Sequence, residues 1–211
     1  MIRFDNVSCF SLNELLKIES ESEIGTYISK FACSRNAEIE SYLKNNALEF
    51  NRKHQAISYL LFDKNRNVIA YFALSVKPIN IKIEQLSNNE MKKLLRITEI
   101  DISNDSLNPS AYLIAQIGKK DNSTINLDTI LKFINYYINK AQNICGGVVE
   151  FLESENNDKL IALYQSRGFK TFNIRKSKSG DERKLVQMYR LIWWVLWMLK
   201  FSIILYIEII E

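Results

Sequence analysis

Glycine, proline, cysteine and histidine are all scarce in this chain of 211 residues, which has six, two, three and one of them respectively. Three unevenly spaced cysteines favour neither a disulfide framework nor a zinc site, and they fit the reduced thiols of a cytoplasmic protein. Because His54 is the single histidine, a histidine-rich metal site is excluded and a histidine base has one candidate. We therefore expect no metal cofactor.

Neither charge nor hydrophobicity is extreme. The net charge of +4 is too small to imply nucleic-acid binding without a local cluster of basic residues. Apolar residues make up 47% and charged residues 25% of the chain, a balance typical of a folded globular protein. We expect no targeting segment at the N-terminus, since Arg3, Asp5 and Asn6 interrupt any apolar run. Length and composition indicate one domain, at residues 1–190, followed by a tail.

The tail, residues 191–211, is almost entirely apolar and is broken only by Lys200, Ser202, Glu208 and the final Glu211. A run of this length suits a bilayer crossing, and the tryptophans near its start suit a membrane interface. Basic residues precede the run, so an inserted tail would keep the domain in the cytoplasm. The alternatives are a buried or oligomerising extension and a tail without a role.

The hydrophobic pattern predicts helices and strands in alternation. Residues 11–56 are expected to be mainly helical, and segments 57–62 and 68–76 to form a hairpin across a polar turn. The weakly patterned segment 79–109 holds a short helix near 87–95 and a loop at 104–109. A strand at 111–117, a helix at 127–141, a strand at 148–152, a helix ending at Gly168, and strands at 169–174 and 185–189 follow. This order favours parallel pairing with helices as crossovers.

Two motifs carry a family resemblance: the strand and glycine at 111–118, and the pattern Asn157…Tyr164-x-x-x-Gly168-Phe169. Together they resemble the acetyl-coenzyme A core of the GNAT N-acetyltransferases, and the likeness extends over most of the chain. It implies an α/β GNAT-like fold with a mixed central sheet flanked by helices. In that fold the parallel strands 112–118 and 148–152 splay apart.

In the GNAT family the splayed strands bind the pantetheine arm through backbone groups, and the pyrophosphate rests on the following loop and helix N-terminus. The resemblance therefore implies acetyl-CoA as co-substrate. The residues that would contact it are Ile114, Gln116, Ile117, Gly118, Lys119, Lys120, Asn126 and Asn157.

The loop departs from the family pattern, because no glycine follows Gly118 before the helix. Asn126 is expected to stand where a glycine is usual, since asparagine tolerates left-handed backbone. Lys119 and Lys120 would offset the negative charge of Asp128. We expect coenzyme A affinity to be reduced.

Tyr164 is the predicted catalytic residue, because the corresponding tyrosine in GNAT enzymes donates a proton to the departing thiolate. Periodicity alone offers the alternative that Tyr164 belongs to a core stripe. Asn157 would contact the co-substrate or cap the helix, although Asn156 could also be the cap. No general base stands out. Surface positions are expected for the available carboxylates and for the single histidine: Glu99, Asp101, Glu150, Glu153 and His54.

Segments 31–50, 58–63 and 70–75 look like the toxin-type branch of the GNAT superfamily, whose members acetylate aminoacyl-tRNA beside an antitoxin. The resemblance implies tRNA and an antitoxin as partners, and a homodimer is a further option. Phosphate contacts would come from the loop 175–184 and from Lys44, Arg52, Lys53, Lys64 and Arg66. The alternatives are an acetyltransferase for a small amine or a protein amine, and a degenerate GNAT-fold binding module without activity.

Overall fold

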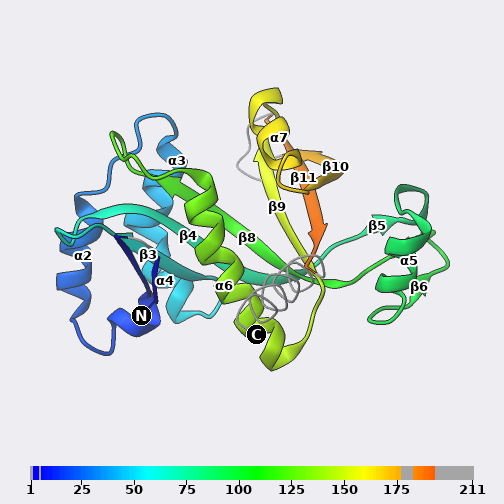
Figure 1. Ribbon diagram of the computed structural model, residues 1–211, viewed down its shortest axis with the longest axis horizontal. Helices are drawn as coiled ribbons and strands as arrows, with labels where there is room; N and C mark the ends of the chain where they lie inside the picture. Colours follow the sequence, from blue (N-terminus) through cyan, green and yellow to red (C-terminus); the bar gives the residue numbers. More distant parts are fainter. Residues whose placement is uncertain (1, 5, 177–182, 193–211) are drawn as a thin grey trace, which may run out of the picture. The chain divides into compact units, whose positions relative to one another are not determined.

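The computed structural model describes residues 2–4, 6–176 and 183–192 (Figure 1). Their fold is mixed α/β, with parallel and antiparallel strands flanked by helices, as predicted. The chain forms two compact units, one of residues 1–76 and 113–145 and the other of residues 77–112 and 146 onward. The predictions for most of the tail and for the middle of the basic loop, 177–182, lie outside the described residues. Within the described part, no helix combines the length and apolar character that a membrane crossing requires.

The sheet of the first unit has the strand order β1-β2-β3-β4-β8. These strands are β1 (Ile2–Phe4), β2 (Val7–Ser11), β3 (Ile57–Phe62), β4 (Val68–Pro78) and β8 (Ser110–Lys119). Each neighbouring pair from β1 to β4 is antiparallel. The predicted hairpin is confirmed as β3–β4, and the Asp63 carboxylate closes its turn by accepting hydrogen bonds from the backbone N–H groups of Asn65 and Asn67. Strands β1 and β2 were not predicted, because they are short and a polar turn separates them.

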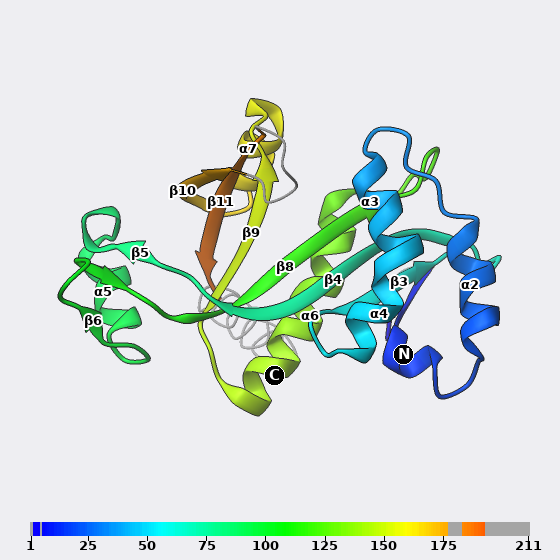
Figure 2. The ribbon, with the colours of Figure 1, turned by 180° about the vertical axis from the view of Figure 1, so that it is seen from behind.

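Helices cover both faces of this sheet (Figures 1 and 2). The helices α3 (Ala37–Ser41) and α4 (Ala47–Arg52), joined by a π-helical turn η1 (Tyr42–Asn46), lie on one face, and α6 (Leu127–Cys145) lies on the other. Two further helices, α1 (Leu12–Leu15) and α2 (Glu21–Ser29), pack into the same core as α4. The predicted helical character of 11–56 is confirmed in separate pieces, because Ser11, Ser20 and Asn36 act as N-caps that start new helices.

Alternation along β3 supplies both layers of the core. Leu60 packs into the cluster formed with α2 and α4, whereas Tyr59 points to the opposite face. There its ring lies 4.2 Å, centroid to centroid, from the ring of Tyr137 on α6. The amphipathic helix predicted at 127–141 is confirmed as α6, which extends four residues beyond the predicted end at 141.

The second unit contains an antiparallel group of strands in the order β9-β11-β10, together with α7. Their bounds are β9 (Val149–Glu155), α7 (Asp158–Gln165), β10 (Lys170–Lys176) and β11 (Lys184–Leu191). The register places Glu150 opposite Arg190. These elements confirm the predicted strands and the predicted last helix.

Segment 79–109 adds a small sheet to the second unit, with the order β5-β7-β6. Its elements are β5 (Ile81–Lys82), the 3-10 turn η2 (Ile83–Gln85), α5 (Asn88–Leu94), β6 (Ile100–Asp101) and β7 (Ser106–Leu107). The predicted short helix is confirmed as α5. The prediction of a loop throughout 104–109 is wrong, because β7 lies within it. A two-residue strand is too short to leave a periodic signal.

Candidate active site

Strand β8 contains the first group of predicted acetyl-CoA contacts. Ile114 is buried, whereas Gln116 and Ile117 are half-buried. In the strand order of the first unit, β8 lies beside β4. The pantetheine contacts, and the splay of this strand from 148–152, remain predictions.

Gly118, at the end of β8, is buried against the side chain of Tyr71. A Cβ atom at position 118 would lie 2.1 Å from Cε1 of Tyr71 and 2.7 Å from Cγ2 of Ile39. Tyr71 is fully buried, and its hydroxyl donates a hydrogen bond to the carbonyl of Ile39 at 2.6 Å. Packing within the first unit therefore explains why a glycine stands here. A backbone contact of Gly118 with acetyl-CoA stays a prediction.

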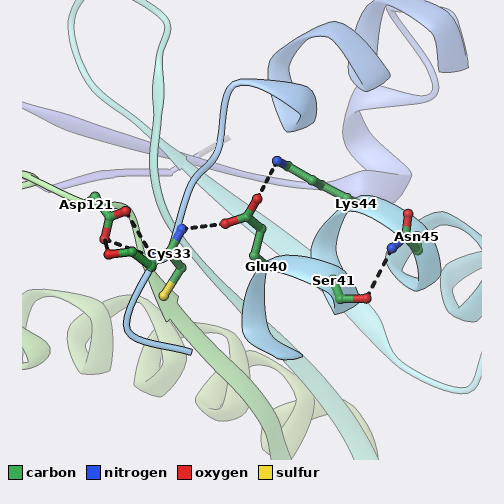
Figure 3. Close-up of polar contacts among 7 residues, drawn as sticks. Cys33, Glu40, Ser41, Lys44, Asn45 and Asp121 are labelled. Atoms are coloured by element: carbon green, nitrogen blue, oxygen red, sulfur yellow. Dashed lines mark hydrogen bonds and ion pairs between the residues drawn. The ribbon is translucent and has the colours of Figure 1, made fainter. Parts of the chain in front are cut away.

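Hydrogen bonds connect the loop between β8 and α6 to β4 and to the segment that follows α2. The backbone N–H of Lys120 donates to the carbonyl of Ile69 at 3.0 Å, and that of Asp121 donates to the carbonyl of Ala32 at 2.8 Å. The Asp121 carboxylate accepts from the backbone N–H and the hydroxyl of Ser34, at 3.0 and 3.1 Å (Figure 3). The loop thus has a defined shape without any glycine.

Glu40 fixes the segment to which this loop is tied. Its carboxylate accepts from the backbone N–H of Cys33 at 2.8 Å and from the ammonium group of Lys44 at 2.6 Å (Figure 3). Lys44 is therefore partly neutralised, although the sequence made it a candidate for phosphate contacts.

Most of the other candidate phosphate ligands are paired in the same way. Arg52 pairs with Glu21, Lys53 with Glu49 and Arg66 with Glu19. Among the five candidates, only Lys64 has no carboxylate partner in the described part of the chain. Exposed ion pairs contribute about 0–1 kcal/mol, so an incoming phosphate can replace these carboxylates at low cost.

Asn126 caps α6: its Oδ1 accepts a hydrogen bond from the backbone N–H of Thr129 at 2.8 Å. The expectation that Asn126 replaces a left-handed glycine is wrong, because the left-handed residue of this loop is Asn122, with φ of 59°. Sequence reasoning missed Asn122, although an Asp-Asn pair in a polar loop is a turn signal.

The loop between β8 and α6 and the N-terminus of α6 fit a phosphate-bearing co-substrate, but we expect a lower affinity than a glycine-rich loop provides. The N-terminus of the long helix α6 favours an anion, and exposed Lys119 and half-buried Lys120 add positive charge. Against this, the Asn126 side chain already occupies part of the helix end, and Asp128 places a carboxylate in the first turn.

Asn157 starts α7, and Gly168 follows its last turn. The Asn157 Oδ1 accepts from the backbone N–H groups of Lys159 and Leu160, at 3.0 and 3.4 Å, so its side chain takes the capping role. Gly168 has φ of 85°, the left-handed conformation predicted for the residue after the helix.

Tyr164 lies on α7 with its ring against Phe169, at a centroid distance of 5.9 Å and an interplanar angle of 74°. Burial raises the pKa of the Tyr164 phenol above its usual value, and the nearby charge of Arg167 opposes this in part. The phenol is therefore protonated at neutral pH and able to donate. Within the described residues its hydroxyl has no hydrogen-bond partner, so no structural bond occupies it.

A buried ion pair lies next to the Phe169 ring that packs against Tyr164. The Arg190 guanidinium carbon lies 4.6 Å from the ring centroid of Phe169, and Arg190 pairs with Glu150, which is 2% exposed. Arg190 also donates to the carbonyl of Arg167 at 3.0 Å. The expectation that Glu150 is a surface carboxylate is wrong, because the cross-strand arginine allows its charge to be buried.

The remaining candidate bases are also accounted for. Glu153 is half-buried, not a surface carboxylate. Burial would raise its pKa, but hydrogen bonds from Arg175 and Gln187, each at 2.7 Å, hold that pKa below its usual range. Hydrogen bonds within its own turn lower the pKa of Asp101 to about 2. Glu99 is exposed, as is His54 after α4, as expected. In the described ranges there is no metal-binding group of His, Cys, Asp and Glu.

No known family model and no curated protein matches the sequence. Solved structures do match in fold. AtaT complexed with acetyl-methionyl-tRNAfMet has a TM-score of 0.60 and 15% identity, covering 85% of this chain and 93% of AtaT. A tyrosine-to-phenylalanine mutant of KacT has a TM-score of 0.63 and 12% identity, covering 92% and 99%. AtaTR bound with acetyl-CoA has a TM-score of 0.57 and 12% identity, covering 93% and 99%. At such identities the likeness concerns the fold, and the predicted fold, a mixed central sheet flanked by helices, is confirmed.

Proposed function

We propose that this protein is an N-acetyltransferase that moves an acetyl group from acetyl-CoA to a primary amine, with aminoacyl-tRNA as the acceptor and a toxin role. The observation that carries the proposal is the protonated hydroxyl of Tyr164, which no structural bond occupies, within the motif from Asn157 to Gly168. The similarity in fold to AtaT, solved with acetyl-CoA and with an acetylated tRNA, supports the choice of donor and acceptor.

Acetyl-CoA supplies an activated acetyl thioester, and the residues of this chain provide its binding and a proton. Tyr164 donates its phenolic proton to the sulfur as the carbon–sulfur bond breaks and the carbon–nitrogen bond forms. The proton that the amine loses passes to solvent, and the Tyr164 phenolate regains a proton from solvent. The raised pKa of this phenol keeps the proton in place until negative charge develops on the sulfur. The backbone of β8 binds the amide-bearing arm, and Lys119 and Lys120 neutralise the pyrophosphate.

The decisive experiment compares Tyr164→Phe with the wild type in an assay of thiol release from acetyl-CoA. General acid catalysis contributes about 10²–10⁴-fold, so we expect a loss of turnover in that range with unchanged acetyl-CoA affinity. Tyr136→Phe is the matched control, since Tyr136 is an exposed tyrosine of α6. If Tyr164→Phe turned over acetyl-CoA as fast as the wild type, Tyr164 would not be the proton donor.

The acceptor is tested separately. With charged tRNA, free polyamines and a lysine-containing peptide offered in parallel, we expect acetylation of the charged tRNA alone. Growth arrest on expression, relieved by Tyr164→Phe, would support the toxin role. Activity on polyamines or peptides and never on charged tRNA would indicate an acetyltransferase for a small amine or a protein amine.

The binding-module alternative is favoured by one observation, the occupied and acid-bearing N-terminus of α6. A titration with acetyl-CoA distinguishes a binding module from an acetyltransferase, because any acetyltransferase must bind the donor. No saturable binding would leave a GNAT-fold module without activity.

We place the protein in the cytoplasm, where charged tRNA is found, and expect an antitoxin as its partner. AtaT has been solved bound to the C-terminus of the antitoxin AtaR, and the similarity in fold supports this expectation. Fractionation of cells expressing the chain with and without residues 191–211 tests membrane association. Measurement of molar mass in solution tests the homodimer.

A further inference from the structure

Arg190 of β11 makes a series of contacts that ends at the ring of Tyr164. The register of β9 and β11 places Arg190 opposite Glu150, and the two side chains form an ion pair. The guanidinium also donates to the carbonyl of Arg167 at 3.0 Å, and its carbon lies 4.6 Å from the ring centroid of Phe169. Helix α7 lies beside β9 and β11 in both views (Figures 1 and 2). The guanidinium is therefore held from two sides, by β9 and by the turn after α7.

Phe169 connects this guanidinium to Tyr164. Phe169 is 2% exposed, and its ring meets the ring of Tyr164 edge to face, at a centroid distance of 5.9 Å. Its backbone N–H donates to the carbonyl of Tyr164 at 3.2 Å. The backbone of α7 fixes the point where the tyrosine side chain begins. The direction of its phenol then depends on rotation about the side-chain bonds, which the Phe169 ring restricts.

The charges of the Arg190–Glu150 pair are buried. Glu150 is 2% exposed, and the Arg190 side chain is 15% exposed. Burial lowers the pKa of Arg190 to about 10, so the guanidinium stays charged at neutral pH. Apolar residues of similar volume often replace a buried ion pair without loss of stability, so stability alone does not explain why charged residues stand here. A planar guanidinium with fixed hydrogen bonds does give the Phe169 ring a defined position.

We propose that Arg190, held by Glu150, is a positioning residue for acetyl transfer, which fixes the Phe169 ring and thereby the direction of the Tyr164 hydroxyl. The inference rests on the proposed function, in which Tyr164 is the proton donor. A displacement of about 1 Å at a reacting group lowers the rate by up to about 10²-fold, even when the protein stays folded. Loss of the pair should therefore slow the chemical step and spare the binding of acetyl-CoA.

The test replaces both partners with apolar residues of similar size, as Glu150→Met together with Arg190→Met. Because no buried charge is left unpaired, thermal unfolding should stay close to that of the wild type. In the thiol-release assay, kcat should fall about 10- to 100-fold, with an unchanged dissociation constant for acetyl-CoA by titration. A wild-type kcat, or a loss confined to acetyl-CoA affinity, would overturn the proposal.

The same two substitutions on a Tyr164→Phe background show whether the effect passes through the phenol. We expect no further fall in kcat, because a side chain without a hydroxyl has no proton to position. An equal fall on both backgrounds would mean that the ion pair acts elsewhere, and it would refute the inference while the proposed function stands. Wild-type turnover by Tyr164→Phe alone would refute the proposed function, and the inference with it.

Two single variants complete the design. Phe169→Leu removes the ring and no charge, so it decides the question if the double variant does not fold. Its kcat should fall on the wild-type background and not on Tyr164→Phe, and an unchanged kcat would overturn the proposal. Lys170→Met is the matched control, because it breaks the neighbouring ion pair with Glu90, at 2.8 Å, and should leave kcat unchanged. A loss in this control as large as in the double variant would overturn the assignment to Arg190.

Discussion

Replacing Gly118 with alanine tests whether this glycine serves the packing of β4 against β8 or the binding of acetyl-CoA. The added Cβ would lie 2.1 Å from Cε1 of Tyr71, whereas ordinary contacts begin at 3.4 Å. Tyr71 has little room to move. Its ring is stacked on Tyr42 and edge-on to Phe31, and its hydroxyl is bonded to the Ile39 carbonyl.

The cost follows from these contacts. Overpacking a well-filled core costs about 1–3 kcal/mol, and displacing the Tyr71 hydroxyl from its acceptor adds about 1 kcal/mol. For a protein of this size, a total of about 2–4 kcal/mol lowers the Tm by roughly 5–15 °C. Urea unfolding followed by circular dichroism measures the free energy directly.

Two further variants make the test specific. On a Tyr71→Leu background, Gly118→Ala should cost less than it does alone, with a coupling energy of about 0.5–3 kcal/mol. Gly25→Ala is the control, because a Cβ on Gly25 of α2 meets no atom within 4 Å and should stabilise the helix. If Gly118→Ala unfolds like the wild type and loses only acetyl-CoA binding, the packing explanation fails.

Three other changes have defined outcomes. Burial would raise the pKa of Glu90, but hydrogen bonds from Lys170 and from Ser87, the cap of α5, lower it to about 2. The ionised Glu90 carboxylate therefore stabilises the fold above its ordinary pKa of 4.5, and this contribution is lost as the pH falls toward 2. Glu90→Gln should make the free energy of unfolding in urea depend less on pH between 4.5 and 2. A pH dependence equal to that of the wild type would contradict this. Arg190→Met strands the buried charge of Glu150 and should cost about 3–5 kcal/mol, of which Glu150→Gln in the same chain should restore part. Asp128→Asn should tighten acetyl-CoA binding about two- to fivefold by titration, and no change would show that the pyrophosphate does not rest at this helix end.

Local signals predicted the elements that depend on nearby residues. The apolar stripe of α6 repeats over many turns, so its existence and its buried face were visible in the sequence. The helix that carries Tyr164 was bounded correctly because both of its ends are marked, by the Asn157 side chain and by left-handed Gly168. The β3–β4 hairpin was likewise set by its polar turn.

Features that depend on distant partners were not predictable. Glu150 is buried because Arg190, 40 residues away, lies opposite it in the register of β9 and β11. The glycine at 118 is required by Tyr71 on another strand. Strands of two or three residues, such as β7 and β1, exist only because neighbours supply their hydrogen bonds, and periodicity cannot detect them.

The loop from Lys119 to Asn126 shows how a glycine-free sequence can replace a glycine turn, and this has a chemical consequence. Left-handed Asn122 provides the turn, while Asp121 anchors the loop to Ser34. That anchoring also uses the backbone N–H groups of Lys120 and Asp121, which donate to carbonyls of the protein. Those two N–H groups are therefore not available to a pyrophosphate at this loop, which leaves the side-chain charges of Lys119 and Lys120 and the N-terminus of α6 to bind it. Salt screens side-chain charges in contact with solvent far more than it screens backbone donors in a closed nest, so the affinity for acetyl-CoA should fall as ionic strength rises.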